Sequence, residues 1–457
     1  MSERARRSSW LVWLAGGGVY FLAFLHRSSL GVAGTKAMDQ LDISATELGS
    51  FVMVQLGLYA TMQVPAGLAI DRWGARRVLL AATLAMGVAQ LGFAFAVNYP
   101  TALAARALLG VGDAAVFIAV LRLAALWFPS RRYAILTSAT GLMGMAGNMA
   151  ATIPLALALD DFGWTRTFAA TGAASLVYAL LLLRPAVAAP FRPEPTAAES
   201  QDAGSRAPRS VARHALDDVR AAWSRRETRL GFWVHQATMM PGAAISFVWG
   251  YPYLTQGLGY SNAAAASQLS IYVVGTLVAS FVIGPLAGRH RPWRAAMGLA
   301  VALGGFLAVV LLVAWPGGQP PGAAVTVAFV ALALGAPGSQ IGFHLARDYN
   351  PAARISTATG LVNVGGFAGA MLAAITIGFV LDLRSSGADP GLADYRWALA
   401  ALAAMAATSI VMMLATLLRV RHDVLARMQR GHDVTVTITE RPWDRVYRRA
   451  RTGATRR

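Results

Sequence analysis

The chain has 457 residues, of which 56% are hydrophobic and only 14% are charged, and its net charge is +18. Because soluble proteins carry about 25% charged residues, this composition argues against a soluble enzyme or a soluble nucleic-acid-binding protein. The chain has no cysteine, which excludes disulfides, thiol catalysis and thiolate metal sites.

Apolar runs long enough to cross a bilayer follow one another along most of the chain. A helix of about 20 apolar residues covers the hydrocarbon core, which is about 30 Å thick. The runs occupy residues 10–33, 47–70, 78–97, 101–127, 133–158, 165–183, 230–255, 266–288, 293–315, 323–345, 355–381 and 395–418. The short alternating segments of a membrane barrel do not occur. The sequence therefore predicts an all-α membrane protein with twelve transmembrane helices.

The positive charges between these spans lie mostly on one side of the membrane. Most of the 40 Lys and Arg residues fall before the first span, after the last, or in every second connection. The positive-inside rule makes that side cytoplasmic, so both termini are predicted in the cytoplasm of a multi-pass plasma-membrane protein. This distribution explains the net charge without nucleic acid, and it lets the basic tail contact anionic membrane lipids.

The composition also divides the chain into parts. Residues 1–184 contain six spans, residues 185–229 form a polar, Pro- and Arg-containing stretch, residues 230–418 contain six more spans, and residues 419–457 form a basic tail. We interpret the second part as a cytoplasmic linker with a short amphipathic helix near residues 211–223.

Two pairs of similar phrases occupy matching places in the two halves. SATGLMGMAG at 138–147 and TATGLVNVGG at 357–366 each begin the fifth span of their half. GLAIDRWGARR at 67–77 and GPLAGRHRPWR at 284–294 each end the second span. These repeats predict two pseudo-symmetric six-helix bundles, related by an axis along the membrane normal.

The phrase at 67–77 resembles the hallmark of the major facilitator superfamily, and the architecture agrees. The hallmark positions are occupied by Gly67, Asp71, Arg72, Gly74, Arg76 and Arg77, and a second family motif matches Arg106, Gly110 and Gly112. The resemblance implies the superfamily fold and transport by alternating access. It also implies that Asp71 accepts hydrogen bonds from the first amides of span eleven, as a gate. Gly288 stands at the equivalent place in the second half, so no duplicate gate is expected there.

Ionisable residues inside the first half suggest a binding site. A charge in the membrane is costly and needs a functional or structural reason. Arg27 and His26 lie in span one, while Arg106 and Asp113 lie seven residues apart, on one face of span four. Our hypothesis is that the two arginines bind an anionic group and that Asp113, with His26, is the proton-coupling site. The alternative is that Arg27, Arg106 and Asp113 form a fixed ion-paired network.

Other ionisable and polar residues in the spans are assigned lesser roles. Gln340 and His344 in span ten are candidate substrate ligands of the second half, because the resemblance implies that spans one, four, seven and ten line the cavity. Arg122 lies near the cytoplasmic end of span four, where its side chain is expected to reach the lipid headgroups. His235 is near a helix end in span seven, and an interfacial role is expected.

These observations predict a secondary active transporter for a small, anionic organic solute, driven by proton symport. We expect a monomer that is not an enzyme and that needs no cofactor or metal; no nucleotide-binding motif is present. Three alternatives stay open. They are a proton-driven exporter of drugs or metabolites, a receptor that binds without transporting, and an intramembrane enzyme using His26, Asp113 and the neighbouring Ser28 and Ser29.

Overall fold

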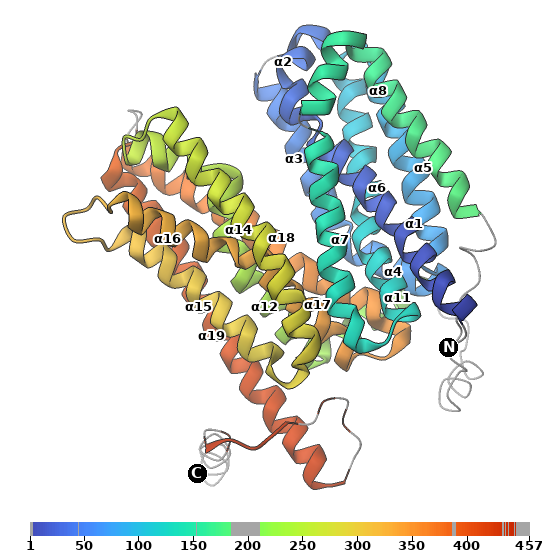
Figure 1. Cartoon of the computed structure of the whole chain (residues 1–457), viewed down its shortest axis with the longest axis vertical. Helices are drawn as coiled ribbons and strands as arrows, with labels where there is room; N and C mark the ends of the chain where they lie inside the picture. Colours follow the sequence, from blue (N-terminus) through green and yellow to red (C-terminus); the bar gives the residue numbers. More distant parts are fainter. Residues whose placement is uncertain are drawn as a thin grey trace. The chain divides into compact units, whose positions relative to one another are not determined.

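The structure, a computed structural model, is helical in all the parts that form regular elements (Figure 1). It describes residues 3–43, 45–151, 153–183, 211–385 and 390–431, together with 434, 436, 438–442 and 444 of the tail. All twelve predicted spans lie on helices or on runs of consecutive helices. Within the described ranges no strand is formed, which agrees with the predicted all-α class.

The helices of the first half follow the predicted spans closely, with breaks at a few positions. Asn98 caps the fourth span because its side chain accepts a hydrogen bond from the Thr101 amide, 3.0 Å away. Gly163, with φ of 76°, divides the last long helix into the end of span five and all of span six. The elements are α1 Glu3–Ser28, α2 Leu30–Leu41, α3 Ala45–Thr61, α4 Gln63–Trp73, α5 Ala75–Ala94, α6 Tyr99–Trp127, α7 Ser130–Ala150, α8 Ile153–Leu183 and the linker helix α11 Val211–Ser224.

In the second half, span seven is the irregular one. It consists of α12 Arg226–Ala244, the π-helical turn η1 Ile245–Trp249, α13 Gly250–Pro252 and a second π-helical turn, η2 Tyr253–Gly257. The remaining elements are α14 Asn262–Arg289, η3 Arg291–Trp293, α15 Arg294–Val313, α16 Gly322–Ala333, α17 Gly335–Tyr349, η4 Ala352–Arg354, α18 Ile355–Ser385 and α19 Leu392–Gln429.

Length and hydropathy of the helices support a membrane-spanning protein. Among the described residues, nine helices are long and apolar enough to cross a bilayer. A tenth is added if α3 and α4, which are bent by 48° at their junction, form one span. The two predicted spans outside this set are α7 in span five and the interrupted helices of span seven.

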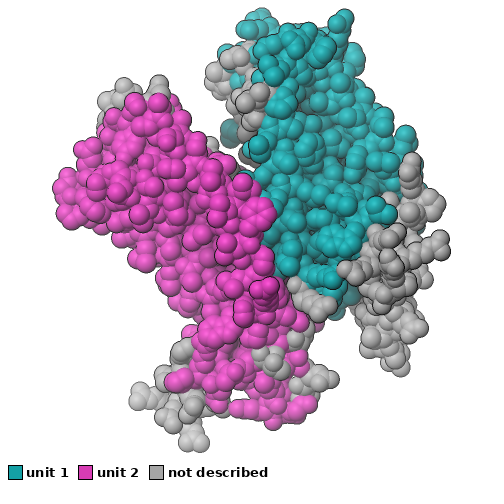
Figure 2. All heavy atoms as spheres, viewed as in Figure 1, with its two compact units in different colours: residues 1–222, 351–360 teal, residues 223–350, 361–457 magenta. Residues whose placement is uncertain are grey.

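The chain folds into two compact units, which Figure 2 colours separately. Unit 1 contains residues 1–222 and 351–360, and unit 2 contains residues 223–350 and 361–457. The start of α18 lies within residues 230–418, which the sequence assigned to the second bundle, but it is grouped with unit 1. Most of the predicted linker, residues 184–210, lies outside the described part of the chain, and its end forms α11, where an amphipathic helix was predicted.

The repeated phrases perform the same packing task in each unit. In unit 1, Gly147 of α7 lies against the carbonyl oxygen of Phe21 in α1, in a space that a Cβ atom would fill. In unit 2, a Cβ atom on Gly365 of α18 would lie 2.7 Å from the carbonyl oxygen of Phe232 in α12. Small residues of this kind let membrane helices approach closely. The final glycines of each phrase therefore pack the fifth span of a half on the first span of that half, as expected of duplicated bundles.

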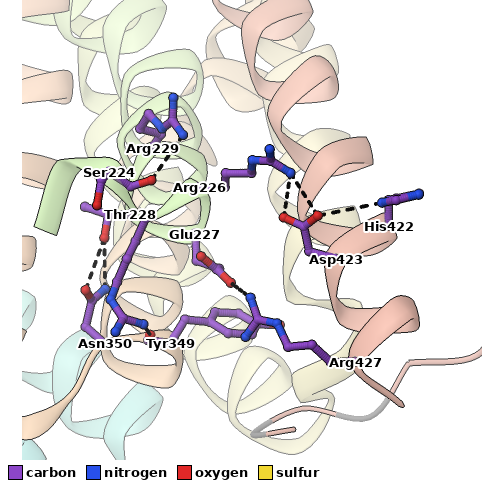
Figure 3. Close-up of polar contacts among 11 residues, drawn as sticks. Ser224, Arg226, Glu227, Thr228, Arg229, Tyr349, Asn350, His422, Asp423 and Arg427 are labelled. Carbon is purple, nitrogen blue, oxygen red and sulfur yellow. Dashed lines mark hydrogen bonds and ion pairs between the residues drawn. The ribbon is translucent and has the colours of Figure 1, made fainter. Parts of the chain in front are cut away.

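The last helix continues beyond the predicted end of span twelve at residue 418. Figure 3 shows the ion pairs that hold this extension to the start of α12. Arg226 contacts Asp423 at 2.6 Å, and Glu227 accepts a hydrogen bond from Arg427 at 3.2 Å. The polar part of α19 is thus stabilised by unit 2 itself, outside the apolar stretch that hydropathy detects.

Candidate functional site

A two-pronged ion pair joins the first and fourth spans. In the last turn of α1, Arg27 donates from Nε to Oδ2 of Asp113 at 2.7 Å and from Nη2 to Oδ1 at 2.8 Å. Asp113 lies in the middle of α6 and its side chain is 1% exposed, whereas that of Arg27 is 14% exposed. The planar guanidinium matches the carboxylate in the geometry that it also uses to bind anionic ligands. The arginine is the more accessible partner.

Aromatic rings frame the guanidinium of Arg27. Its central carbon lies 4.4 Å from the ring centroids of both Phe24 and Tyr59. Tyr20 continues this surface, since its ring lies 4.9 Å from that of Phe24. Ring faces attract cations, and more strongly where water is excluded. Tyr59 belongs to α3 in the second span, which the sequence reasoning did not connect with the site.

Arg106 has a different set of partners from Arg27, although the sequence hypothesis assigned both to one anion. Its side chain is fully buried, and it donates from Nη1 to the carbonyl oxygen of His26 at 3.2 Å and from Nη2 to Oγ of Ser29 at 3.3 Å. The guanidinium lies 3.7 Å from the ring centroid of Phe93. Arg27 therefore meets Asp113, while Arg106 meets the backbone of the first span.

His26 contacts span six instead of Asp113. Its Nε2 lies 2.7 Å from Oγ of Ser175 in α8, and both residues are fully buried. The hydroxyl of Ser175 can donate or accept in this contact, depending on the tautomer of the imidazole. The sequence placed His26 beside the charged residues but had no signal for its partner.

The second-half candidates lie on α17 in unit 2. His344 is buried, and Gln340 is half-buried with its Oε1 atom unpaired among the described residues. Ser339 precedes Gln340, and its carbonyl oxygen lies 3.0 Å from Nδ1 of His235 in α12. His235 is 2% exposed, so the expected interfacial role for it is wrong. This region also lies near charged groups, because Arg294 and Arg347 are charged neighbours of His344.

The hallmark motif makes the contact that the resemblance implies. Oδ1 of Asp71 accepts from the Ser356 amide at 3.1 Å, and Oδ2 accepts from the amide and the hydroxyl of Thr357, both at 2.8 Å. These amides begin α18, where a helix favours negative charge. Gly67 permits the approach, because a Cβ atom there would lie 2.6 Å from the Ser356 carbonyl oxygen. Asp71 thus binds a segment 285 residues away within unit 1.

The other hallmark residues shape the turn and its surface. Gly74 has φ of 84°, a conformation that favours glycine, and it separates α4 from α5. Arg76 donates to the carbonyl oxygens of Leu182 and Leu183 at the end of α8, at 2.7 and 3.0 Å. Arg72 and Arg77 are exposed. Arg122, which was expected to reach the headgroups, is half-buried and is a charged neighbour of Asp71.

The corresponding part of unit 2 also contains an ion-paired carboxylate, on a different helix. Asp348, near the end of α17, accepts from Arg291 at 2.9 Å and also pairs with Arg294. The side chains of Asp348 and Arg294 are 2% and 1% exposed. Arg294 in addition donates to the carbonyl oxygen of Ala287 at 2.8 Å. All of these partners belong to unit 2.

Part of the basic tail returns to α19. Asp444 accepts two hydrogen bonds from Arg421, at 2.7 and 2.9 Å, and one from the backbone amide of Arg441 at 2.8 Å. Partial burial alone would raise the pKa of Asp444, but the hydrogen bonds outweigh it and lower this pKa below its ordinary value. No group of three acidic or histidine side chains in the described residues is arranged to hold a metal ion.

Sequence and structure comparisons agree on the class of protein. The family model of the Major Facilitator Superfamily matches residues 17–250 and again residues 232–452. Among solved structures, the proton:xylose symporter XylE aligns with a TM-score of 0.64 at 15% identity, covering 90% of this chain and 96% of its own. The Escherichia coli fucose:proton symporter FucP aligns with a TM-score of 0.63, also at 15% identity, covering 90% and 99%. At this identity the likeness concerns the fold.

Curated relatives match a shorter part of the chain. A probable sulfoacetate transporter of Cupriavidus necator is 28% identical over 36% of this chain and 38% of its own length. The D-galactonate transporter of Escherichia coli is 27% identical over 35% and 37%. A putative tartrate transporter of Agrobacterium vitis is 31% identical over 26% and 28%. The matches thus span less than two fifths of each relative.

Proposed function

Because the chain belongs to the major facilitator superfamily, we propose that it is a secondary transporter of a small organic anion, coupled to protons. The observation that carries this proposal is the Arg27–Asp113 pair, in which a partly exposed arginine is neutralised by a buried carboxylate. Sulfoacetate, galactonate and tartrate, which appear in the names of the relatives, are all organic anions. They support an acid with further polar groups as the solute.

The ion pair suggests how proton and solute are coupled. Asp113 occupies the edge formed by Nε and Nη2, one through which Arg27 would bind a carboxylate or sulfonate with two hydrogen bonds. When Asp113 is protonated, it no longer holds the guanidinium strongly, and the solute anion replaces it as the partner of Arg27. An unpaired buried charge is costly, so the two events favour each other. Proton and anion then move together, as in a symporter. His26 is the second candidate for proton coupling.

The Asp71 contact supplies a gate for alternating access. Its three hydrogen bonds hold the first turn of α18 to the end of α4, and they must break before this turn can leave unit 1. With both termini assigned to the cytoplasm by the positive-inside rule, the gate lies on the cytoplasmic side of the plasma membrane.

Gln340 and His344 are proposed as polar ligands of the second half, for the uncharged groups of the solute.

The test is uptake of externally added, labelled sulfoacetate, D-galactonate or tartrate by liposomes that contain the purified protein. We expect an inward proton gradient to drive accumulation of at least one of them. Asp113→Asn should abolish this accumulation but preserve exchange of labelled for unlabelled solute, because an amide cannot lose a proton.

Asp160→Asn is the matched control, since Asp160 pairs with Lys36 at the surface. Accumulation by Asp113→Asn at the unmodified rate would refute the coupling role of Asp113. Binding without any flux would favour a receptor.

A further inference from the structure

Arg106 is a buried cation whose partners are uncharged. Its side chain is 0% exposed, and within the described residues it forms no ion pair; it donates to the His26 carbonyl oxygen and to the Ser29 hydroxyl. Burial of a charge is expensive unless other groups stabilise it. The contacts of this guanidinium therefore indicate what Arg106 does.

Those contacts lie where the first span breaks. Helix α1 ends at Ser28 and α2 begins at Leu30. The His26 carbonyl is one of the last four of α1, which a helix leaves without amide partners, and the helix dipole makes this end negative. The hydroxyl of Ser29 donates to the same carbonyl at 2.8 Å. Arg106 and Ser29 thus form one network that caps α1.

The aromatic cluster of unit 1 holds the guanidinium in place. The ring of Phe93, which Arg106 faces, packs against Trp164 at 5.0 Å and Phe168 at 5.2 Å between centroids. A cation over a desolvated ring is attracted to its face, and a planar guanidinium stacks there while its edge still donates hydrogen bonds. A lysine ammonium lacks this combination of a flat face and a forked edge.

This network lies directly beside the proposed anion ligand. Arg27 follows His26, so capping the His26 carbonyl fixes the backbone from which the Arg27 side chain extends. Seven residues further along α6, Asp113 binds the guanidinium of Arg27 itself. One helix face therefore holds the end of α1 at two points, one on the backbone and one on a side chain.

We propose that Arg106 is a positioning residue that caps the end of α1 and thereby orients Arg27, without contacting the solute. The proposal rests on the proposed function, because it takes Arg27 as the anion ligand. It assigns the two arginines, which the sequence could not distinguish, to separate roles.

The test compares Arg106→Lys, Ser29→Ala and the double variant. Two quantities are measured on purified protein: hydrogen–deuterium exchange of the peptide over residues 22–33, and the Kd for whichever of sulfoacetate, D-galactonate and tartrate binds most tightly. Each single variant should raise both the exchange rate and the Kd by about tenfold, as expected for a lost buried hydrogen bond. The double variant should have the same exchange rate and Kd as Arg106→Lys alone, because Arg106 and Ser29 both donate to the His26 carbonyl oxygen.

Controls separate this proposal from the proposed function. Thr83→Val also deletes a buried hydroxyl bonded to a helix carbonyl in unit 1, and it should change neither quantity. If Arg106→Lys weakens binding while Ser29→Ala changes neither exchange nor Kd, Arg106 contacts the solute and the positioning role is refuted. If Arg27→Ala leaves the Kd unchanged, or if none of the three acids binds, the proposed role of Arg27 as the anion ligand is refuted. The exchange data then still decide whether Arg106 caps α1. Ser29→Ala keeps the test decisive if Arg106→Lys does not fold.

Discussion

The segments that join the second and third spans differ between the two halves. In residues 67–77, the carboxylate of Asp71 binds backbone amides of a segment 285 residues away. In residues 284–294, Gly288 occupies the matching position, and Arg291 and Arg294 bind Asp348 of the same unit. A contact with a distant segment can open without unfolding the bundle to which it belongs. A buried ion pair between neighbouring helices instead stabilises the fold, and we call the contacts of Asp348 with Arg291 and Arg294 the brace. Duplicated sequence has thus given one half a contact with a distant segment, which we propose as a gate, and the other a contact within its own bundle.

The largest effect is expected when the brace is broken. Asp348→Asn leaves the buried guanidinium of Arg294 without its carboxylate, which should lower the free energy of unfolding by about 3–5 kcal/mol. The melting temperature in detergent measures it. Asp423→Asn, which breaks a partly exposed ion pair in the same unit, is the control and should cost far less. A loss in Asp348→Asn no larger than that of the control would mean that Asp348 is not a brace.

Breaking the proposed gate should change a conformational equilibrium instead of stability. Asp71→Asn removes the charge from three hydrogen bonds and should favour the open gate by about 2 kcal/mol, roughly thirtyfold. The chain lacks cysteine, so Ser356→Cys, at a fully buried position, gives a single thiol whose labelling rate reports opening. Unchanged labelling in the Asp71→Asn background would remove Asp71 from the gate.

A smaller change within the same contact should have a proportionately smaller effect. Thr357→Val deletes one hydroxyl bond to Asp71 and leaves both amides, so labelling should rise about fivefold, corresponding to about 1 kcal/mol. Thr359→Val is matched, because the Thr359 hydroxyl bonds only the Ile355 carbonyl in its own helix among the contacts described. Equal labelling in the two variants would show that the Thr357 hydroxyl contributes nothing to closure.

The smallest effect is expected from the linker helix. Asp218 of α11 contacts Arg354 at 3.0 Å, and so also holds the segment that Asp71 binds. The two side chains are 44% and 33% exposed, and ion pairs of this kind contribute less than about 1 kcal/mol. Asp218→Asn should therefore raise the labelling rate less than fivefold, and the difference should vanish at high salt. A larger effect, insensitive to salt, would make α11 a main part of the gate.

The sequence by itself determined the class of fold and the duplicated plan. Transfer of apolar residues into lipid is a local property of each segment, so hydropathy located the spans. Small residues at helix contacts are likewise visible as a pattern, and the two repeated phrases do pack equivalent helices. The hallmark around Asp71 indicated a contact with span eleven because the family pattern carries that information.

Only the tertiary structure decided which partners the polar side chains have. A spacing of seven residues places Arg106 and Asp113 on one face of α6, but helix rotation and packing decided that Asp113 meets Arg27 while Arg106 donates to the His26 carbonyl oxygen. The same holds for Tyr59 beside Arg27 and Asp348 beside Arg294. Periodicity specifies the direction of a side chain relative to its own helix, whereas a partner depends on neighbouring helices that are remote in sequence.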